Sequence, residues 1–263
     1  MKKQLFSLAA LLSASFATAA GGMVFTDPIN TVLPDHPSLS GTYWGWTYRT
    51  NFPSGPYIVD VNTSSSVKKS LILSTGNTPF NNPASPGVAG YQVYARRDPS
   101  IDFRLGSSVR ARLDYAAGHS ILAESPVPGQ MIGIQDNRGY FFGIGFAWNS
   151  TIQQRYVRII TNPFTGAGSP WVAVPKTNEF FNDPGLPAGN FYDVELVIAG
   201  SRASILVSGR EMKNTGGFPL VVDAGAPLTS LIFSDWINHG GVVVGDYSTT
   251  SSGYIAINSL SYY

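Results

Sequence analysis

Two carboxylates that converge on one bond are the usual machinery of glycoside hydrolysis. One pair in the chain has suitable spacing, because Asp193 and Glu195 lie two residues apart in a segment that alternates like a β-strand. The other glutamates after residue 19 are widely separated, at Glu124, Glu179 and Glu211. We interpret the pair as an ordinary solvated strand face rather than as a catalytic pair.

Other catalytic motifs are missing. The three histidines, His36, His119 and His239, lie far apart and lack the spacing of metal ligands. A serine triad would need a nucleophile elbow, and the chain has no G-x-S-x-G motif and no glycine-rich phosphate loop. Cysteine is absent, which excludes thiol chemistry, Cys-ligated metals and disulfides.

A charged set alternates with apolar residues in the stretch 109–114. Arg110, Arg112 and Asp114 should point to one side of a strand, and the apolar residues between them to the other. Guanidinium groups bridge sugar hydroxyls or neutralise a carboxylate, so this face is a candidate floor for a carbohydrate groove. The alternative is that the three residues pair with one another in water, which contributes about 0–1 kcal/mol.

An aromatic set offers a second candidate binding surface. Trp44, Trp46 and Tyr48 alternate, so all three should project from one side of a strand, where their rings could stack on sugars. Tryptophan is highly buried on average, so the alternative is that the trio fills the core. Trp236 has polar neighbours, which favour a place at the rim of a site.

The elements that must position these residues are short strands. Alternation and turn residues predict strands at 43–50, 57–61, 71–74, 90–95, 109–114, 131–135, 140–148, 153–161, 171–174, 191–199, 202–207, 228–233, 241–244 and 254–262. Asp136 to Gly139 should turn the chain between two of them, and Gly200-Ser201 between two others. Such a series predicts an all-β fold, a sandwich of two antiparallel sheets in one domain.

Two segments carry a family resemblance. An aromatic-led strand at 192–198 is followed by a strand at 203–209 that ends in Ser208-Gly209. Near the C-terminus, Val243-Val244-Gly245-Asp246-Tyr247-Ser248 precedes a last strand at 254–258. Both resemble the concanavalin A-like lectin/glucanase superfamily, which implies a jelly-roll sandwich whose last strand pairs beside the first. That superfamily includes lectins, glycosidases, lyases and adhesion modules, so it leaves the activity open.

The resemblance also suggests specific chemistry. Polysaccharide lyases of this fold use Arg, Gln, His and Tyr, and Arg110, Arg112, Gln135 and Tyr140 invite that comparison. Asp136 follows Gln135, so the usual Gln-x-His element is missing and the lyase base is unaccounted for. Lectin-like folds often bind calcium, for which the candidate oxygen donors are Asp235, Asn238 and Asp246. Their spacing is not that of an EF-hand, and turn capping is the favoured alternative; no other cofactor is expected.

The N-terminus is typical of an export signal. Lys2 and Lys3 precede an apolar stretch from Leu5 to Leu12, and Ala17-Thr18-Ala19 has the small-x-small pattern that signal peptidase reads. This predicts a signal peptide at 1–19 and a single β-sandwich domain at 20–263, in a secreted, periplasmic or cell-surface protein. The apolar stretch is shorter than the roughly 20 residues that span a bilayer, so no transmembrane segment is expected.

Composition narrows the partners. The net charge is +1, and removal of Lys2 and Lys3 with the signal lowers it to −1, which provides no electrostatic footprint for nucleic acid. Charged residues make up 13% of the chain, no more than the 13% that are aromatic, as suits a turn-rich extracellular domain.

We therefore favour a non-catalytic module that binds polysaccharide or cell-surface glycan, or that builds part of the envelope. The alternatives are a polysaccharide-degrading enzyme, for which a lyase is favoured over a hydrolase, and a purely structural envelope protein.

Overall fold

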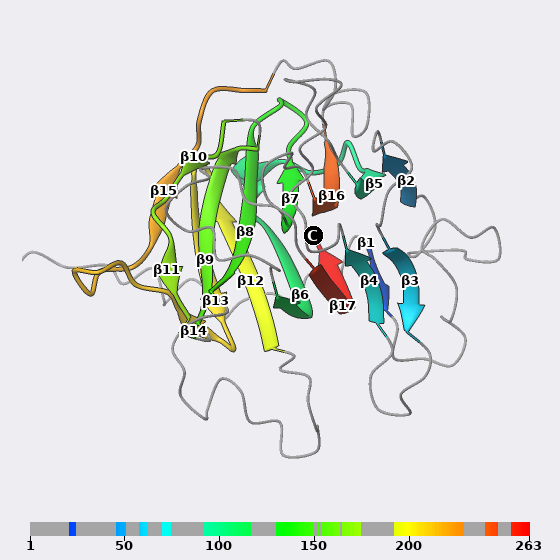
Figure 1. Ribbon diagram of the computed structural model, residues 1–263. Coiled ribbons are helices and arrows are strands. Elements are labelled where there is room, and N and C mark those ends of the chain that lie inside the picture. The colour runs from blue at the N-terminus through cyan, green and yellow to red at the C-terminus, as the bar shows by residue number, and fades with distance from the viewer. Residues whose placement is uncertain are drawn as a thin grey trace, which may run out of the picture.

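Two antiparallel β-sheets stacked face to face make up the computed structural model (Figure 1). It describes residues 21–24, 46–50, 58–62, 70–74, 92–116, 130–149, 152, 154–163, 165–174, 192–228, 240–246 and 254–263. In Figure 1 the green strands β8 and β9 of one sheet lie in front of the yellow strands β12 and β13 of the other. The all-β sandwich expected from the strand pattern is confirmed.

Sheet A contains both ends of the described chain. Its strands follow the order β14 (Arg210–Glu211), β13 (Arg202–Val207), β12 (Tyr192–Ala199), β6 (Ser107–Ala116), β17 (Tyr254–Tyr262), β4 (Ser70–Ser74) and β3 (Ile58–Asn62). In addition, β15 (Val221–Asp223) pairs with β13, and β1 (Gly21–Val24) pairs with the C-terminal part of β17. The last strand therefore lies beside the first, as the resemblance implied.

Sheet B forms the second layer. Its order is β10 (Ala167–Gly168), β9 (Gln154–Asn162), β8 (Phe141–Asn149), β7 (Gln130–Gln135), β16 (Gly241–Asp246), β5 (Gln92–Arg97) and β2 (Trp46–Thr50), with β11 (Val172–Ala173) pairing with β9. A short 3-10 turn at Phe103–Leu105 is the only helical element within the described ranges. The described residues therefore include no helix that is long and apolar enough to cross a membrane.

The main core lies between the sheets and follows from strand alternation. On β12, Tyr192, Val194, Leu196 and Ile198 are buried while the residues between them are half-buried. On sheet B, Ile132, Ile134, Phe142 and Ile144 face them from β7 and β8. At about 25 cal/mol per Å² of buried apolar surface, this cluster is the principal stabilising feature of a chain without disulfides.

A second apolar layer covers the outer face of sheet B. Its members are Val93, Ala95, Met131, Phe141, Ile160, Leu228 and Val243. Glycines make room for it, since a Cβ on Gly133 would lie 2.5 Å from the Phe141 ring. All six residues of β7 are consequently buried, which explains why that strand reads as a continuous apolar run.

Two local expectations have different outcomes. The turn predicted at Asp136 to Gly139 joins β7 to β8, and Gly200-Ser201 joins β12 to β13, so both hairpins are confirmed. The strand predicted from Leu228 does not begin at that residue, which lies outside any strand. Leu228 instead packs on sheet B, and its backbone amide donates to the Gly139 carbonyl at 2.9 Å. The rest of that segment, 229–233, lies outside the described residues.

Candidate binding face on sheet A

The charged residues of β6 and β12 meet on the outer face of sheet A. In the antiparallel register, Arg112 is opposite Asp193 and Arg110 is opposite Glu195. Directly opposed residues project from the same face of a sheet. Their apolar neighbours Val109, Ala111 and Leu113 are buried, so this face points away from the core, as the alternation of 109–114 predicted. We call Arg110, Arg112, Asp193 and Glu195 the charged ladder.

Asp193 connects the two arginines. Its Oδ2 atom lies 3.2 Å from Nη2 of Arg110 and 3.9 Å from Nη1 of Arg112. The side chains of Arg110, Arg112 and Asp193 are 57%, 35% and 32% exposed, so water and ligands reach all three. Exposed pairs of this kind contribute about 0–1 kcal/mol to stability, so a requirement for folding does not explain the ladder.

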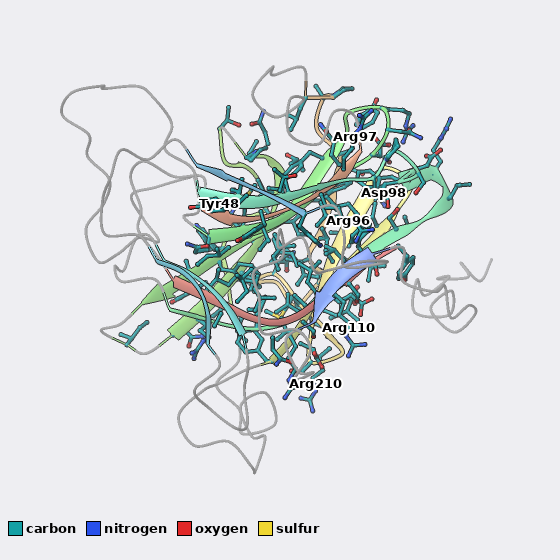
Figure 2. All side chains as sticks on the ribbon, turned by 90° about the vertical axis from the view of Figure 1, so that its right-hand side faces the viewer. Tyr48, Arg96, Arg97, Asp98, Arg110 and Arg210 are labelled. Atoms are coloured by element: carbon teal, nitrogen blue, oxygen red, sulfur yellow. The ribbon has the colours of Figure 1, made fainter. Side chains whose placement is uncertain are left out.

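Polar residues continue from the ladder onto the next strand. Ser259 is opposite Arg112, and Ser261 is opposite Arg110 on β17. Both serines are half-buried. Figure 2 shows the two layers nearly edge-on, with Arg110 on the outer side of the lower layer, away from Arg96 and Asp98. A strip of hydroxyl, guanidinium and carboxylate groups thus crosses β12, β6 and β17.

The two arginines share a carboxylate that the sequence did not assign to them. The sequence left open that Arg110, Arg112 and Asp114 pair with one another. Asp193 on the neighbouring strand supplies a carboxylate to both arginines. The backbone of Asp114 lies in β6 opposite Ala256, and its side chain lies outside the described residues. Asp193 was visible in the sequence only as a possible partner of Glu195, because strand pairing leaves no local signal.

The aromatic candidates divide between the core and undescribed segments. Trp46 is 3% exposed and belongs to the main core, so it is unavailable for stacking on an exposed face. Tyr48 packs against the same core, with its ring centroid 5.2 Å from that of Tyr94. For these two residues the core alternative is the one observed. Trp44 and Trp236 lie outside the described residues.

The lyase comparison finds no common site. Gln135 is buried on sheet B and its Nε2 donates to the Gly139 carbonyl at 3.1 Å, within the β7–β8 turn. Tyr140 lies against Arg138, whose Cζ is 5.0 Å from the ring centroid. Gln135 ends β7 of sheet B and Tyr140 directly precedes β8 of that sheet, whereas Arg110 and Arg112 face outward from sheet A. The structure therefore does not bring these four residues together.

Other charged groups stabilise turns. Asp136 is fully buried and accepts from the amides of Arg138 and Tyr140 and from the Arg138 guanidinium. A hydrogen bond from the Arg104 side chain holds the pKa of Asp102 at about 2.

In the described part of the chain, no three acidic or histidine side chains gather as metal ligands. Of the expected calcium donors, Asp235 and Asn238 lie outside that part, and Asp246 ends β16, so calcium binding stays a prediction.

A buried arginine on β9 was not anticipated. Arg158 is 8% exposed, its Cζ lies 5.3 Å from the Trp171 ring centroid, and its Nη2 donates to the Gly166 carbonyl. Burial lowers the pKa of its guanidinium. The stack fastens the segment between β10 and β11 onto sheet B. In the sequence, Trp171 was visible only as the first residue of the strand predicted at 171–174.

Comparisons with known proteins identify no family. No protein-family model matches the chain, and no curated protein matches it. Solved structures that it resembles include the VIP36 exoplasmic/lumenal domain in its Ca2+/Man2-bound form, at 10% identity and a TM-score of 0.43 over 93% of this chain and 87% of that one. An alginate lyase of polysaccharide lyase family 7 is 10% identical, with a TM-score of 0.39 over 81% and 84% of the chains.

A Bacteroides ovatus protein, GH43B of a xyloglucan PUL, is also similar at 10% identity and a TM-score of 0.44. The match covers 88% of this chain but only 38% of that protein, so the chain spans little more than a third of its length. These three are concanavalin A-like sandwich proteins, the group that the sequence resembles. At such identities and TM-scores the likeness carries no argument about activity.

Proposed function

We propose that this protein is a secreted, non-catalytic module that binds glycan through the charged ladder of sheet A. The observation that carries the proposal is the bridging of Arg110 and Arg112 by Asp193 on an exposed strand face. The arrangement presents guanidinium donors and a carboxylate acceptor side by side. Sugar hydroxyls both donate and accept hydrogen bonds, so neighbouring hydroxyls match such an alternation.

The charge balance of the ladder favours a neutral polysaccharide. Arg110 and Arg112 are each opposite a carboxylate, so the four side chains carry no net charge. A uronic acid polymer would bring further carboxylates toward Asp193 and Glu195, and like charges repel. A neutral polymer lacks that penalty and still offers hydroxyl groups to every member of the ladder.

The geometry of the acidic pair supports a binding role over hydrolysis. Asp193 and Glu195 share a face, as their spacing predicted, but that face is open to solvent. Hydrolysis uses one carboxylic acid as a proton donor to the leaving group. The Oδ2 atom of Asp193 is instead in contact with both arginines, in a position suited to ordering their donors.

The test is retention on immobilised polysaccharides. The wild-type protein should be retained by at least one of cellulose, xylan, mannan and β-1,3-glucan, and Arg112→Ala should lose most of that retention with an unchanged melting temperature. Arg202→Ala is a matched control, because Arg202 is also exposed on sheet A and paired with a carboxylate, Asp223, at 2.9 Å. The control should bind normally.

Failure has a defined meaning. If none of these polysaccharides retains the wild-type protein, binding through the ladder is wrong and the structural envelope alternative becomes the better hypothesis. Release of unsaturated or reducing sugar ends from any polymer would instead favour the degrading enzyme. Fractionation of the native protein with the envelope, without glycan binding, would support structural assembly.

A further inference from the structure

The segment between β14 and β15 is a hydrogen-bonded loop that projects from the edge of sheet A. Figure 1 shows it extending to the left, away from the body of the molecule. Both of its ends are anchored, because Met212 and Leu220 are 4% exposed and belong to the main core. The Leu220 amide donates to the Met212 carbonyl at 2.8 Å and closes the base of the loop.

Asn214 organises the interior of this loop. Its backbone amide donates to the Phe218 carbonyl at 2.8 Å, and its backbone carbonyl accepts from the Gly217 amide at 2.9 Å. Its side-chain Oδ1 accepts from the amides of Gly216 at 2.9 Å and Phe218 at 3.2 Å. These four bonds hold the backbone at Phe218 before any ligand arrives, which lowers the entropy cost of binding.

Phe218 is presented to solvent by this loop. Its exposed fraction is 69% although it is a large apolar residue. The ring lies against Gly216, where an added Cβ would be 3.2 Å from the ring atom Cδ2. Gly216 and Gly217 have no side chains that would shield it. The ring is thus supported from one side and accessible from outside.

The size of this surface points to a small ligand. Large exposed apolar residues within the described ranges are few and mostly scattered: Leu105, Ile152, Phe218, Val221 and Tyr263. A stable protein interface buries about 800 Å² per partner, whereas one aromatic side chain supplies roughly 150–250 Å². A single flat ring instead matches the apolar face of one sugar ring, and Lys213 and Asn214, exposed residues of the same loop, have side-chain donors for hydroxyls.

The loop is continuous with the charged ladder. Sheet A runs from β6 through β12 and β13 to β14, and the loop leaves from the end of β14. Strands lie about 4.8 Å apart, so β6 and β14 are separated by roughly 14 Å. Figure 2 shows Arg110 and Arg210 of β14 on the same side of the molecule. We infer that Phe218 is a stacking subsite for a glycan chain that also contacts the ladder, an inference that rests on the proposed function.

The test separates the ring from the loop. With cellulose, xylan, mannan and β-1,3-glucan as probes, Phe218→Ala should weaken binding by about tenfold, and Phe218→Trp should retain it. Leu105→Ala is the matched control, since Leu105 is 85% exposed elsewhere on the surface. Asn214→Ala should weaken binding as a positioning effect, while Asn214→Asp, which keeps the acceptor oxygen, should weaken it less.

The outcomes distinguish the two proposals. If Arg112→Ala abolishes retention while Phe218→Ala leaves it unchanged, the subsite is wrong and the proposed function stands. If Phe218→Ala weakens retention while Arg112→Ala does not, Phe218 binds glycan, but binding by the ladder and the continuity between the ladder and Phe218 are both wrong. Binding to vesicles of phosphatidylcholine and phosphatidylglycerol that depends on Phe218, without polysaccharide binding, would overturn the inference in favour of a membrane contact.

Discussion

The hydroxyl of Tyr262 donates a hydrogen bond to the carboxylate of Asp98 at 3.2 Å, across 164 residues of sequence. Tyr262 ends β17 in sheet A, and Asp98 directly follows β5 in sheet B, so the bond joins the two layers. The Cζ atom of Arg96 lies 5.7 Å from the Tyr262 ring centroid. Figure 2 shows Arg96 and Asp98 close together at this side of the sandwich.

Tyr262→Phe removes this bond and should lower the free energy of unfolding by about 1 kcal/mol, the typical net value of one hydrogen bond. The ring itself stays in the core, so the effect should not approach that of a cavity. Urea denaturation at neutral pH measures it. An unchanged stability would show that the contact between the layers is energetically neutral.

The same variant tests a pH dependence. Burial is the main cause that raises the pKa of the Tyr262 phenol well above its ordinary value, and Asp98 adds to the effect while Arg96 opposes it. Because the pKa of Tyr262 is higher in the folded state, its protonated phenol contributes fully to the stability of the fold below the unfolded pKa of about 10. That contribution is lost as the pH rises from there toward the folded pKa. Between pH 9 and pH 11, roughly, the wild-type melting temperature should therefore fall more than that of Tyr262→Phe.

Gly21→Ala should disrupt the pairing of β1 with β17. A Cβ at this position would lie 2.5 Å from the Tyr262 hydroxyl oxygen and 2.8 Å from Cζ of Arg96, so both groups would have to move. Overpacking of this kind costs about 1–3 kcal/mol. Gly209→Ala is a contrasting variant, because its φ of 76° disfavours alanine but the space around it is open. The melting temperatures of the two variants compare the effect of a steric clash, at position 21, with that of backbone strain, at position 209.

Leu196→Ala should cost roughly 2–5 kcal/mol, because Leu196 is fully buried in the main core. Val197 is the control, since it is the next residue on β12 but is only half-buried on the outer face. Its replacement by alanine should cost clearly less. Equal losses for the two variants would contradict the assignment of faces. Reductant should change neither result, because the chain has no cysteine.

Export should remove residues 1–19, and the secreted protein should begin at Ala20. Strand β1 begins at Gly21, directly after that residue, so this cut would leave all of β1 on the mature chain. N-terminal sequencing of protein from the culture fluid or the envelope is the measurement. An intact Met1 would count against both the signal peptide and the extracellular location.

Local periodicity was sufficient for strands such as β6 and β12 and for the orientation of their side chains, but it did not predict β1 or β15. Val109 and Leu113 are buried and Arg110 faces outward, as alternation within one strand requires. The Asp136 turn was also predictable, because its residues favour a turn wherever the surrounding strands lie. These features depend only on neighbours in the chain, so they can be predicted without knowledge of the fold.

Which surfaces are open to solvent and which distant residues are in contact depend on how the strands pair and the sheets stack. Arg110 contacts Asp193, 83 residues away, because β6 and β12 pair in one register, and no local pattern encodes that pairing. Trp46 could have faced either side, and it is buried because its side of β2 faces the core. Strand β7 of sheet B is buried on both faces while the ladder of sheet A is exposed, a difference that depends on how the layers stack. Phe218 became a candidate only once its exposure and the hydrogen bonds of its loop were known.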